Sequence, residues 1–226
     1  MIQSKEKKDR DTTFREPLFR SPFYDFFAAQ ETEGHWYNWN GYKSPTILSD
    51  EELEYFSIRS TSSVFDITPL NKYRIVGSQA EEFLNKLTVR NVAKQNIATV
   101  KYTLWCDQEG FVIDDGTLFR ISDNDFRLCS QEKHLPWLID TSHGFDVEII
   151  DESKHVCGIS LQGPTSASIL RLLGINGIDN LKPFHLFQTK ISNMPIMISR
   201  TGFTGDLGYE IFMKNNVANK IIERVW

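Results

Sequence analysis

The chain has 226 residues, with 25 Lys and Arg against 30 Asp and Glu, which gives a formal net charge of −5. Its 40% of hydrophobic and 24% of charged residues are typical of a globular protein and exclude a disordered chain. Beyond the first twenty residues no stretch concentrates Lys and Arg, which argues against nucleic-acid binding.

The cysteines and the start of the chain indicate the compartment. Cys106, Cys129 and Cys157 lie too far apart for a metal knuckle, and their odd number argues against a secreted disulfide framework. No run approaches the roughly 18 apolar residues of a membrane span, and charges occupy the place of a signal peptide's apolar core. We therefore expect a cytoplasmic protein with no membrane contact, a flexible tail over 1–20 and a folded domain over 21–226.

The first folded segment, 21–49, is rich in aromatics and turn formers but has no clear period. We expect a packed, irregular segment here. Its aromatic side chains would either line a pocket or cover the core, and the second role is the commoner one. Ser49, with Glu52 three residues later, forms a capping box that predicts a helix over 50–60.

The next stretch has the order of an α+β layer of ferredoxin-like type. A second capping box, Ser78 with Glu81, predicts a helix after a first strand. The sequence DQEG predicts a hairpin turn. In chain order the elements are a strand over 72–76, the helix after 78, strands over 102–106, 111–121 and 126–129, a helix over 131–143 and a strand over 146–150.

The pattern then restarts. It predicts strands over 155–162, 195–199 and 209–213, a helix over 163–174 and a last helix from 217. No stop signal for that helix precedes Trp226.

Two neighbouring acids, Asp114 and Asp115, interrupt the apolar strand FVIDDGTLF. Neighbours on a strand point to opposite faces, so one carboxylate faces inward if the strand is half buried. A buried carboxylate needs a partner, a ligand or a catalytic task. The alternative is that both acids lie in water at a bulge or strand end, and alternation leaves open which of the two faces inward.

The stretch RTGFTGDLGYEIF places Gly202, Gly205 and Gly208 at intervals of three before a strand. It is neither a Walker loop nor a dinucleotide-binding motif, and it predicts a tight loop that needs positive φ or close backbone approach. Glu210 shares a strand face with Phe212, which makes it a candidate ligand acceptor or a solvent-facing acid on an edge strand.

The five histidines have no metal-binding spacing, and each is expected at the surface or in a satisfied core. They are His35, His134, His143, His155 and His185.

Six stretches carry a resemblance: RSTSSVFDIT, AEEFLNKLTVRNVAK, YTLWCDQEGFVIDDGTLFRI, LQGPTSASIL, KPF and RTGFTGDLGYEI. In this order and spacing, over about 59–213, they resemble the folate-binding aminomethyltransferase family, typified by the T-protein of the glycine cleavage system. The family also includes tetrahydrofolate-dependent demethylases of methylated sulfur, amine or aryl ether substrates. The resemblance implies a cloverleaf around a hole that holds tetrahydrofolate, with ferredoxin-like and antiparallel-sheet subdomains interleaved over 21–226 and a C-terminal barrel that these residues do not include.

The resemblance also implies three site residues. It places Asp114 beside the reactive pteridine nitrogens, Glu210 on the pterin and Tyr102 against the ring. These residue types suit the chemistry, because one carboxylate accepts the two parallel donors of a pterin edge and a second holds the proton that leaves the reacting nitrogen.

Some positions depart from the family pattern. HWYNWNGYKSP stands where glycine-cleavage enzymes carry an MVPFAGW-like stretch, which puts the donor in doubt, and Asp206 replaces a longer Glu. The KGCYxGQE-like motif of the iron–sulfur assembly branch is absent. Family members continue past Trp226 through an RLEAG-like segment whose Arg contacts the folate, so the 226 residues alone are expected to bind weakly and to be inactive.

The function expected from the resemblance is tetrahydrofolate-dependent transfer of an aminomethyl or methylene group. The alternatives are a demethylase that passes a methyl group to tetrahydrofolate and a folate-binding module without turnover. The expected partners are folate and a small methylated or aminomethyl substrate, with a lipoyl carrier protein if the glycine-cleavage assignment holds.

Overall fold

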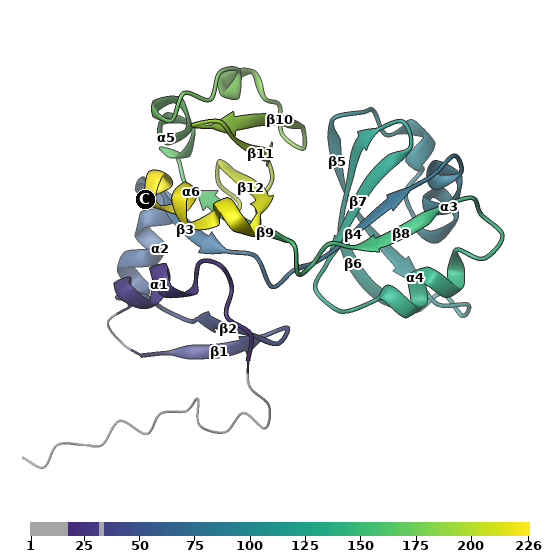
Figure 1. Cartoon of the computed structure of the whole chain (residues 1–226), viewed down its shortest axis with the longest axis horizontal. Coiled ribbons are helices and arrows are strands. Elements are labelled where there is room, and N and C mark those ends of the chain that lie inside the picture. Colours follow the sequence, from purple (N-terminus) through teal and green to yellow (C-terminus); the bar gives the residue numbers. More distant parts are fainter. Residues whose placement is uncertain (1–17, 32–33) are drawn as a thin grey trace, which may run out of the picture.

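The computed structural model describes residues 18–31 and 34–226. It contains two five-stranded antiparallel sheets and a small hairpin, with helices packed on them (Figure 1). The strands are β1 Trp36–Trp39, β2 Tyr42–Pro45, β3 Ser63–Asp66, β4 Asn71–Val76, β5 Thr99–Cys106, β6 Val112–Ser122, β7 Asp125–Ser130, β8 Glu148–Asp151, β9 Val156–Gln162, β10 Leu186–Ile191, β11 Met194–Ser199 and β12 Gly208–Lys214. The helices are α1 Tyr24–Gln30, α2 Glu51–Ser60, α3 Ala80–Leu87, α4 Leu135–Thr141, α5 Ser166–Leu172 and α6 Ala218–Val225, with 3-10 turns η2 Val92–Lys94, η3 Ile178–Asn180 and η4 Asn215–Val217.

The first sheet has the order β5-β6-β7-β4-β8 and carries α3 and α4. Helix α3 has apolar residues at Phe83, Leu84 and Leu87, the spacing of a helix face, and the first two are buried against the sheet. Leu138 of α4 joins the same core. The α+β class and the predicted order of strand, helix, three strands, helix and strand are confirmed.

The second sheet has the order β10-β11-β12-β9-β3, and the first sheet is inserted in the chain between β3 and β9. Helices α5 and α6 bury Leu170, Ile221 and Ile222 in its core, to which Phe27 of α1 also contributes. Figure 1 shows the two sheets as separate lobes joined by the crossings from β3 to β4 and from β8 to β9.

A third apolar cluster joins the two sheets. Phe119 of β6 and Phe212 of β12 meet edge to face at 5.6 Å between ring centroids. Tyr209 and Ile211 lie in the other core, as the predicted alternation of β12 requires. The position of the first sheet relative to β12 therefore depends on a packed interface.

One prediction about the first 49 residues needs correction. Residues 21–49 are not irregular, because they form helix α1 and the hairpin of β1 and β2. Of the predicted tail, 1–17 lie outside the described residues, whereas Phe19 pairs with Tyr42 as an isolated bridge.

Both capping boxes were wrong in detail. Helix α2 is capped by Asp50, whose carboxylate accepts from the Leu53 N–H at 2.9 Å, and not by Ser49. Helix α3 has no side-chain cap among the described residues, because Ser78 donates instead to Asp146.

Other element bounds also differ from the predictions. The predicted helix over 131–143 is shorter, and the two short strands β3 and β10 were not predicted. No helix in the part of the chain that the structure describes is long and apolar enough to cross a membrane.

Candidate functional site

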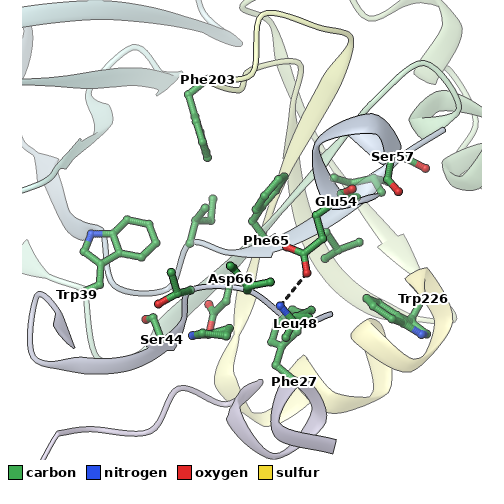
Figure 2. Close-up of a pocket in the computed structure, with 18 of the residues that line it drawn as sticks. Phe27, Trp39, Ser44, Leu48, Glu54, Ser57, Phe65, Asp66, Phe203 and Trp226 are labelled. Carbon is green, nitrogen blue, oxygen red and sulfur yellow. Dashed lines mark hydrogen bonds between the residues drawn. The ribbon is translucent and has the colours of Figure 1, made fainter. Parts of the chain in front are cut away.

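A cavity of about 900 Å³ lies between the hairpin, α2, β3 and the loop before β12 (Figure 2). Its volume falls in the range of small-molecule and cofactor sites. The lining is mostly apolar and has six aromatic side chains, which are Phe27, Tyr37, Trp39, Phe65, Phe203 and Trp226. Such a lining removes apolar ligand surface from water, so orientation depends on the few polar groups present.

The aromatic side chains come from segments far apart in the sequence. In Figure 2, Trp39 points into the cavity from the hairpin and Phe203 from the loop before β12. Phe203 meets Phe65 of β3 with ring centroids 5.8 Å apart. The hairpin therefore serves both predicted roles, since Trp39 lines the cavity and also packs against the third apolar cluster.

Three carboxylates line the cavity: Glu54, Asp66 and Glu210. Among the described residues, its lining includes no Lys, Arg or His. When ionised, these carboxylates only accept hydrogen bonds, and they favour ligand groups that donate hydrogen bonds or carry positive charge.

Glu210 is placed on β12 by pairing with strands on either side. It pairs with Ser160 of β9, which pairs in turn with Phe65 of β3, so the three side chains share one face of the sheet. Thr201 donates to Glu210 Oε2 at 2.6 Å, and Ser199 lies 2.6 Å from the Thr201 hydroxyl. Burial raises the pKa of Glu210, against the opposing effect of the Thr201 hydrogen bond.

The loop with Gly202, Gly205 and Gly208 fits around the buried side chain of Gln162. A Cβ on Gly202 or Gly208 would lie 2.1 or 2.0 Å from Gln162 Oε1, while Gly205 has φ +78°. Close approach and positive φ, the two predicted uses of glycine here, thus occur at different positions. Gln162 accepts from Thr204 at 2.9 Å, and this contact fixes the loop that carries Phe203.

Arg59 of α2 ties the same loop from the outside. Its guanidinium donates to the Thr204 carbonyl at 2.8 Å and forms a salt bridge with Asp206. The shorter acid at 206 therefore reaches a partner across the loop.

Asp66 is a cavity acid that the sequence analysis did not single out. Burial raises its pKa, although Ser21 and the Thr68 N–H donate to it, the latter at 2.8 Å. The sequence signal for Asp66 is its position in VFD, within the matching stretch RSTSSVFDIT. The sequence analysis predicts no strand there, whereas the structure has β3.

Asp114 lies on β6 with its side chain 10% exposed. Its Oδ1 accepts from the Asp115 N–H at 2.8 Å, and its Oδ2 accepts from the Glu132 N–H at 3.1 Å and bonds to His134 Nε2 at 2.8 Å. Asp115 is exposed, so Asp114 is the acid of the pair that turns inward. Two residues further along β6, Gly116 permits the close approach of β7, because a Cβ there would lie 2.1 Å from the Cys129 carbonyl oxygen.

Tyr102 lies on the edge strand β5, where 48% of it is exposed. A hydrogen bond with the Asp115 carboxylate raises the pKa of its hydroxyl. Arg90 donates to its backbone carbonyl at 2.9 Å.

The three predicted site residues do not share one lining. Glu210 lines the cavity, and Asp114 lies just beyond it, because Gln131 lines the cavity and the next residue, Glu132, donates to Asp114. Tyr102 lies on β5, the strand that pairs with β6, which carries Asp114.

His134 is a second residue, after Asp66, that sequence reasoning did not assign to the site. It is 11% exposed and bonded to Asp114, and no spacing rule links positions 20 apart on different elements. Among the described residues no group of three or more His, Cys, Asp or Glu could hold a metal ion.

Comparison with known families and proteins gives a consistent result. Residues 25–226 match the family described as the GCVT N-terminal domain. An aminomethyltransferase of Clostridium botulinum (strain Okra / Type B1) is 31% identical over 192 residues, which cover 82% of this chain and 51% of the relative. One from Geobacillus thermodenitrificans (strain NG80-2) is 30% identical over 217 residues, covering 93% and 57%. The chain thus spans about half the length of the curated relatives it matches.

Solved structures share the fold. The glycine cleavage system aminomethyltransferase T from Bartonella henselae has a TM-score of 0.82 at 22% identity, over 92% of this chain and 57% of that one. A chain of heterotetrameric sarcosine oxidase from Corynebacterium sp. U-96 has a TM-score of 0.59 at 16% identity, over 92% of both. At these identities the likeness concerns the arrangement of strands and helices alone.

Proposed function

Because this chain belongs to the family of the GCVT N-terminal domain, we propose that it acts in the transfer of a one-carbon group to tetrahydrofolate. Curated relatives at about 30% identity are named aminomethyltransferases, which supports an aminomethyl or methylene group as the cargo. The observation that carries the proposal is Glu210, a carboxylate in an apolar cavity whose described hydrogen bond is to one hydroxyl.

The polar groups of the cavity fit the pterin end of a folate. A pterin edge presents two parallel donors, and Glu210 keeps acceptor capacity beyond its Thr201 bond. The flat ring suits a lining that includes Phe65 and Phe203. The anionic tail of a folate finds no cation in the described lining, so that tail would point out of the cavity.

Asp114 is the proposed catalytic residue. Tetrahydrofolate, when bound, would supply the nucleophilic nitrogen that receives the one-carbon group. Asp114, on the first sheet, lies next to the cavity wall at Gln131 and would hold the proton released at that nitrogen. Tyr102 would contact the outer part of the bound folate. It lies on β5, the strand that also carries Trp105, the cross-strand partner of Asp114.

The lining also bears on the donor. Carboxylates at Glu54, Asp66 and Glu210 favour an amine or another cationic donor over an anionic one. Aromatic faces such as Trp39 attract methylated ammonium or sulfonium groups, which favours the demethylase as a second candidate. A lipoyl carrier protein would present the donor only in the aminomethyl case.

The test is incubation with tetrahydrofolate and a panel of donors, followed by mass spectrometry of the folate products. Methylene-tetrahydrofolate from an aminomethyl donor supports the proposal, and methyl-tetrahydrofolate from a methylated donor supports the demethylase. Binding without product identifies a folate-binding module. Both the 226-residue chain and a form extended through the reading frame after Trp226 should be assayed, and the proposal is refuted if the extended form shows neither binding nor product.

A further inference from the structure

We infer that His134 is a positioning residue for Asp114. Its imidazole fixes one oxygen of the Asp114 carboxylate and leaves the other oxygen to face the ligand. The inference rests on the proposed function, in which Asp114 acts at the reacting nitrogen. It starts from the 2.8 Å contact between His134 Nε2 and Asp114 Oδ2, in which both side chains are about nine-tenths buried.

The hydrogen bonds of Asp114 are distributed unequally. Within the described residues Oδ2 has two donors, the Glu132 N–H and His134 Nε2, whereas Oδ1 has only the local Asp115 N–H. A carboxylate has about four lone-pair sites, so the acceptor site left over lies on Oδ1. This makes Oδ1 the oxygen that can accept a ligand proton.

The contact also defines which imidazole nitrogen carries hydrogen. An ionised carboxylate only accepts, so His134 Nε2 must donate to Oδ2. This assigns the Nε2–H tautomer to the neutral ring.

The imidazole and the backbone of His134 each have one further contact. The ring meets the indole of Trp105 edge to face, with centroids 5.3 Å apart, and Trp105 is fully buried. The backbone N–H of His134 donates to the hydroxyl of Tyr73 at 2.9 Å. Since Trp105 is also the cross-strand partner of Asp114, one indole fixes the spacing between the carboxylate and the imidazole.

A structural role and a positioning role predict different results for two substitutions. The glutamine side chain of a His134→Gln variant can place its amide nitrogen near the Nε2 position and still donate, whereas His134→Leu removes the donor. We expect His134→Gln to keep turnover within a few-fold of wild type. We expect His134→Leu to lower kcat by roughly 10- to 100-fold with little change in KM, which is the effect of a misaligned group.

The matched control is His143→Gln. His143 is exposed just after α4 and bonds to the Ile139 carbonyl, away from Asp114. All variants are first compared by thermal melting, and a His134→Leu protein that does not fold leaves the comparison to His134→Gln and to the spectroscopic test.

The spectroscopic test needs no turnover. In ¹⁵N–¹H spectra of the wild-type chain, the His134 ring should show a slowly exchanging proton on Nε2, which shifts or disappears in Asp114→Asn but not in Asp115→Asn. A ring signal unchanged in Asp114→Asn overturns the inference, as does a His134→Leu variant with wild-type kcat. If the wild type shows the signal but neither it nor the form extended past Trp226 yields product with any donor, the pairing stands and the proposed function fails.

Discussion

The substitution Glu210→Gln tests the cavity most directly. Glu210 is a partly buried carboxylate with a raised pKa and a hydrogen bond from Thr201. An amide of nearly the same shape keeps an acceptor for Thr201 but presents an N–H to a ligand edge that itself donates. The charge-assisted pair is lost and a ligand donor is left unmatched.

The expected cost follows from that pairing. Losing a hydrogen bond to a charged group costs about 1.5 to 3 kcal/mol, which corresponds to roughly a 10- to 150-fold weaker tetrahydrofolate affinity. The free protein should not lose stability, because the substitution removes a carboxylate that burial disfavours in its charged form. Isothermal titration and thermal melting measure the two effects separately.

Glu54→Gln is the matched control. Glu54 also lines the cavity, but its Oε1 already accepts from the Leu48 and Ser49 N–H groups at 2.7 and 2.9 Å, which an amide oxygen can also do (Figure 2). We expect less than a two- to three-fold change in Kd. Equal effects of Glu54→Gln and Glu210→Gln, or an unchanged Kd in Glu210→Gln, would refute the reasoning.

Three further predictions concern groups outside the cavity lining. Burial raises the pKa of Cys129 to about 11 and of Cys157 to about 12, so a thiol reagent at pH 8 should label the native chain at the partly exposed Cys106 alone; rapid labelling of two thiols would contradict this. Burial lowers the pKa of Lys72 to about 8. Between that pH and the ordinary lysine pKa of about 10.4, the unfolded state therefore binds more protons than the folded state. The free energy of unfolding of the wild type should therefore rise with pH relative to Lys72→Met, by up to about 1.4 kcal/mol per pH unit, and a flat difference in urea titrations would argue against a buried amine. Gly116→Ala should lower stability by about 1 to 3 kcal/mol, since its Cβ would meet the Cys129 carbonyl, and an unchanged melting temperature would show that β6 and β7 separate freely there.

Much of the fold could be predicted because period and turn chemistry act locally. The strand β12 was predicted with its two faces correct, since Glu210 and Phe212 alternate with Tyr209 and Ile211. The edge strand β10 was missed, because its outward positions carry polar residues such as Gln188 that resemble a loop.

The caps show how neighbouring residues compete. Ser49 and Asp50 are both good N-caps, and sequence alone does not rank two adjacent candidates. In the structure Glu54, and not Glu52, accepts from the backbone N–H of Ser49, so the reciprocal half of the predicted box is not formed, and Asp50 caps Leu53.

The site was only partly accessible from sequence for a different reason. Alternation predicted that one of Asp114 and Asp115 turns inward, but the choice depends on donors from Glu132 and His134 that β-sheet pairing brings across from another segment. Likewise the hairpin aromatics had no period, so Trp39 could be assigned to the cavity only once the hairpin was placed.

A structure of the protein with bound tetrahydrofolate tests the central claim most directly. We predict the pterin ring inside the cavity, with its two-donor edge on Glu210 and the reactive nitrogens on the side of Gln131 and Asp114. A pterin bound outside the cavity, or inside it with that edge away from Glu210, would contradict the account.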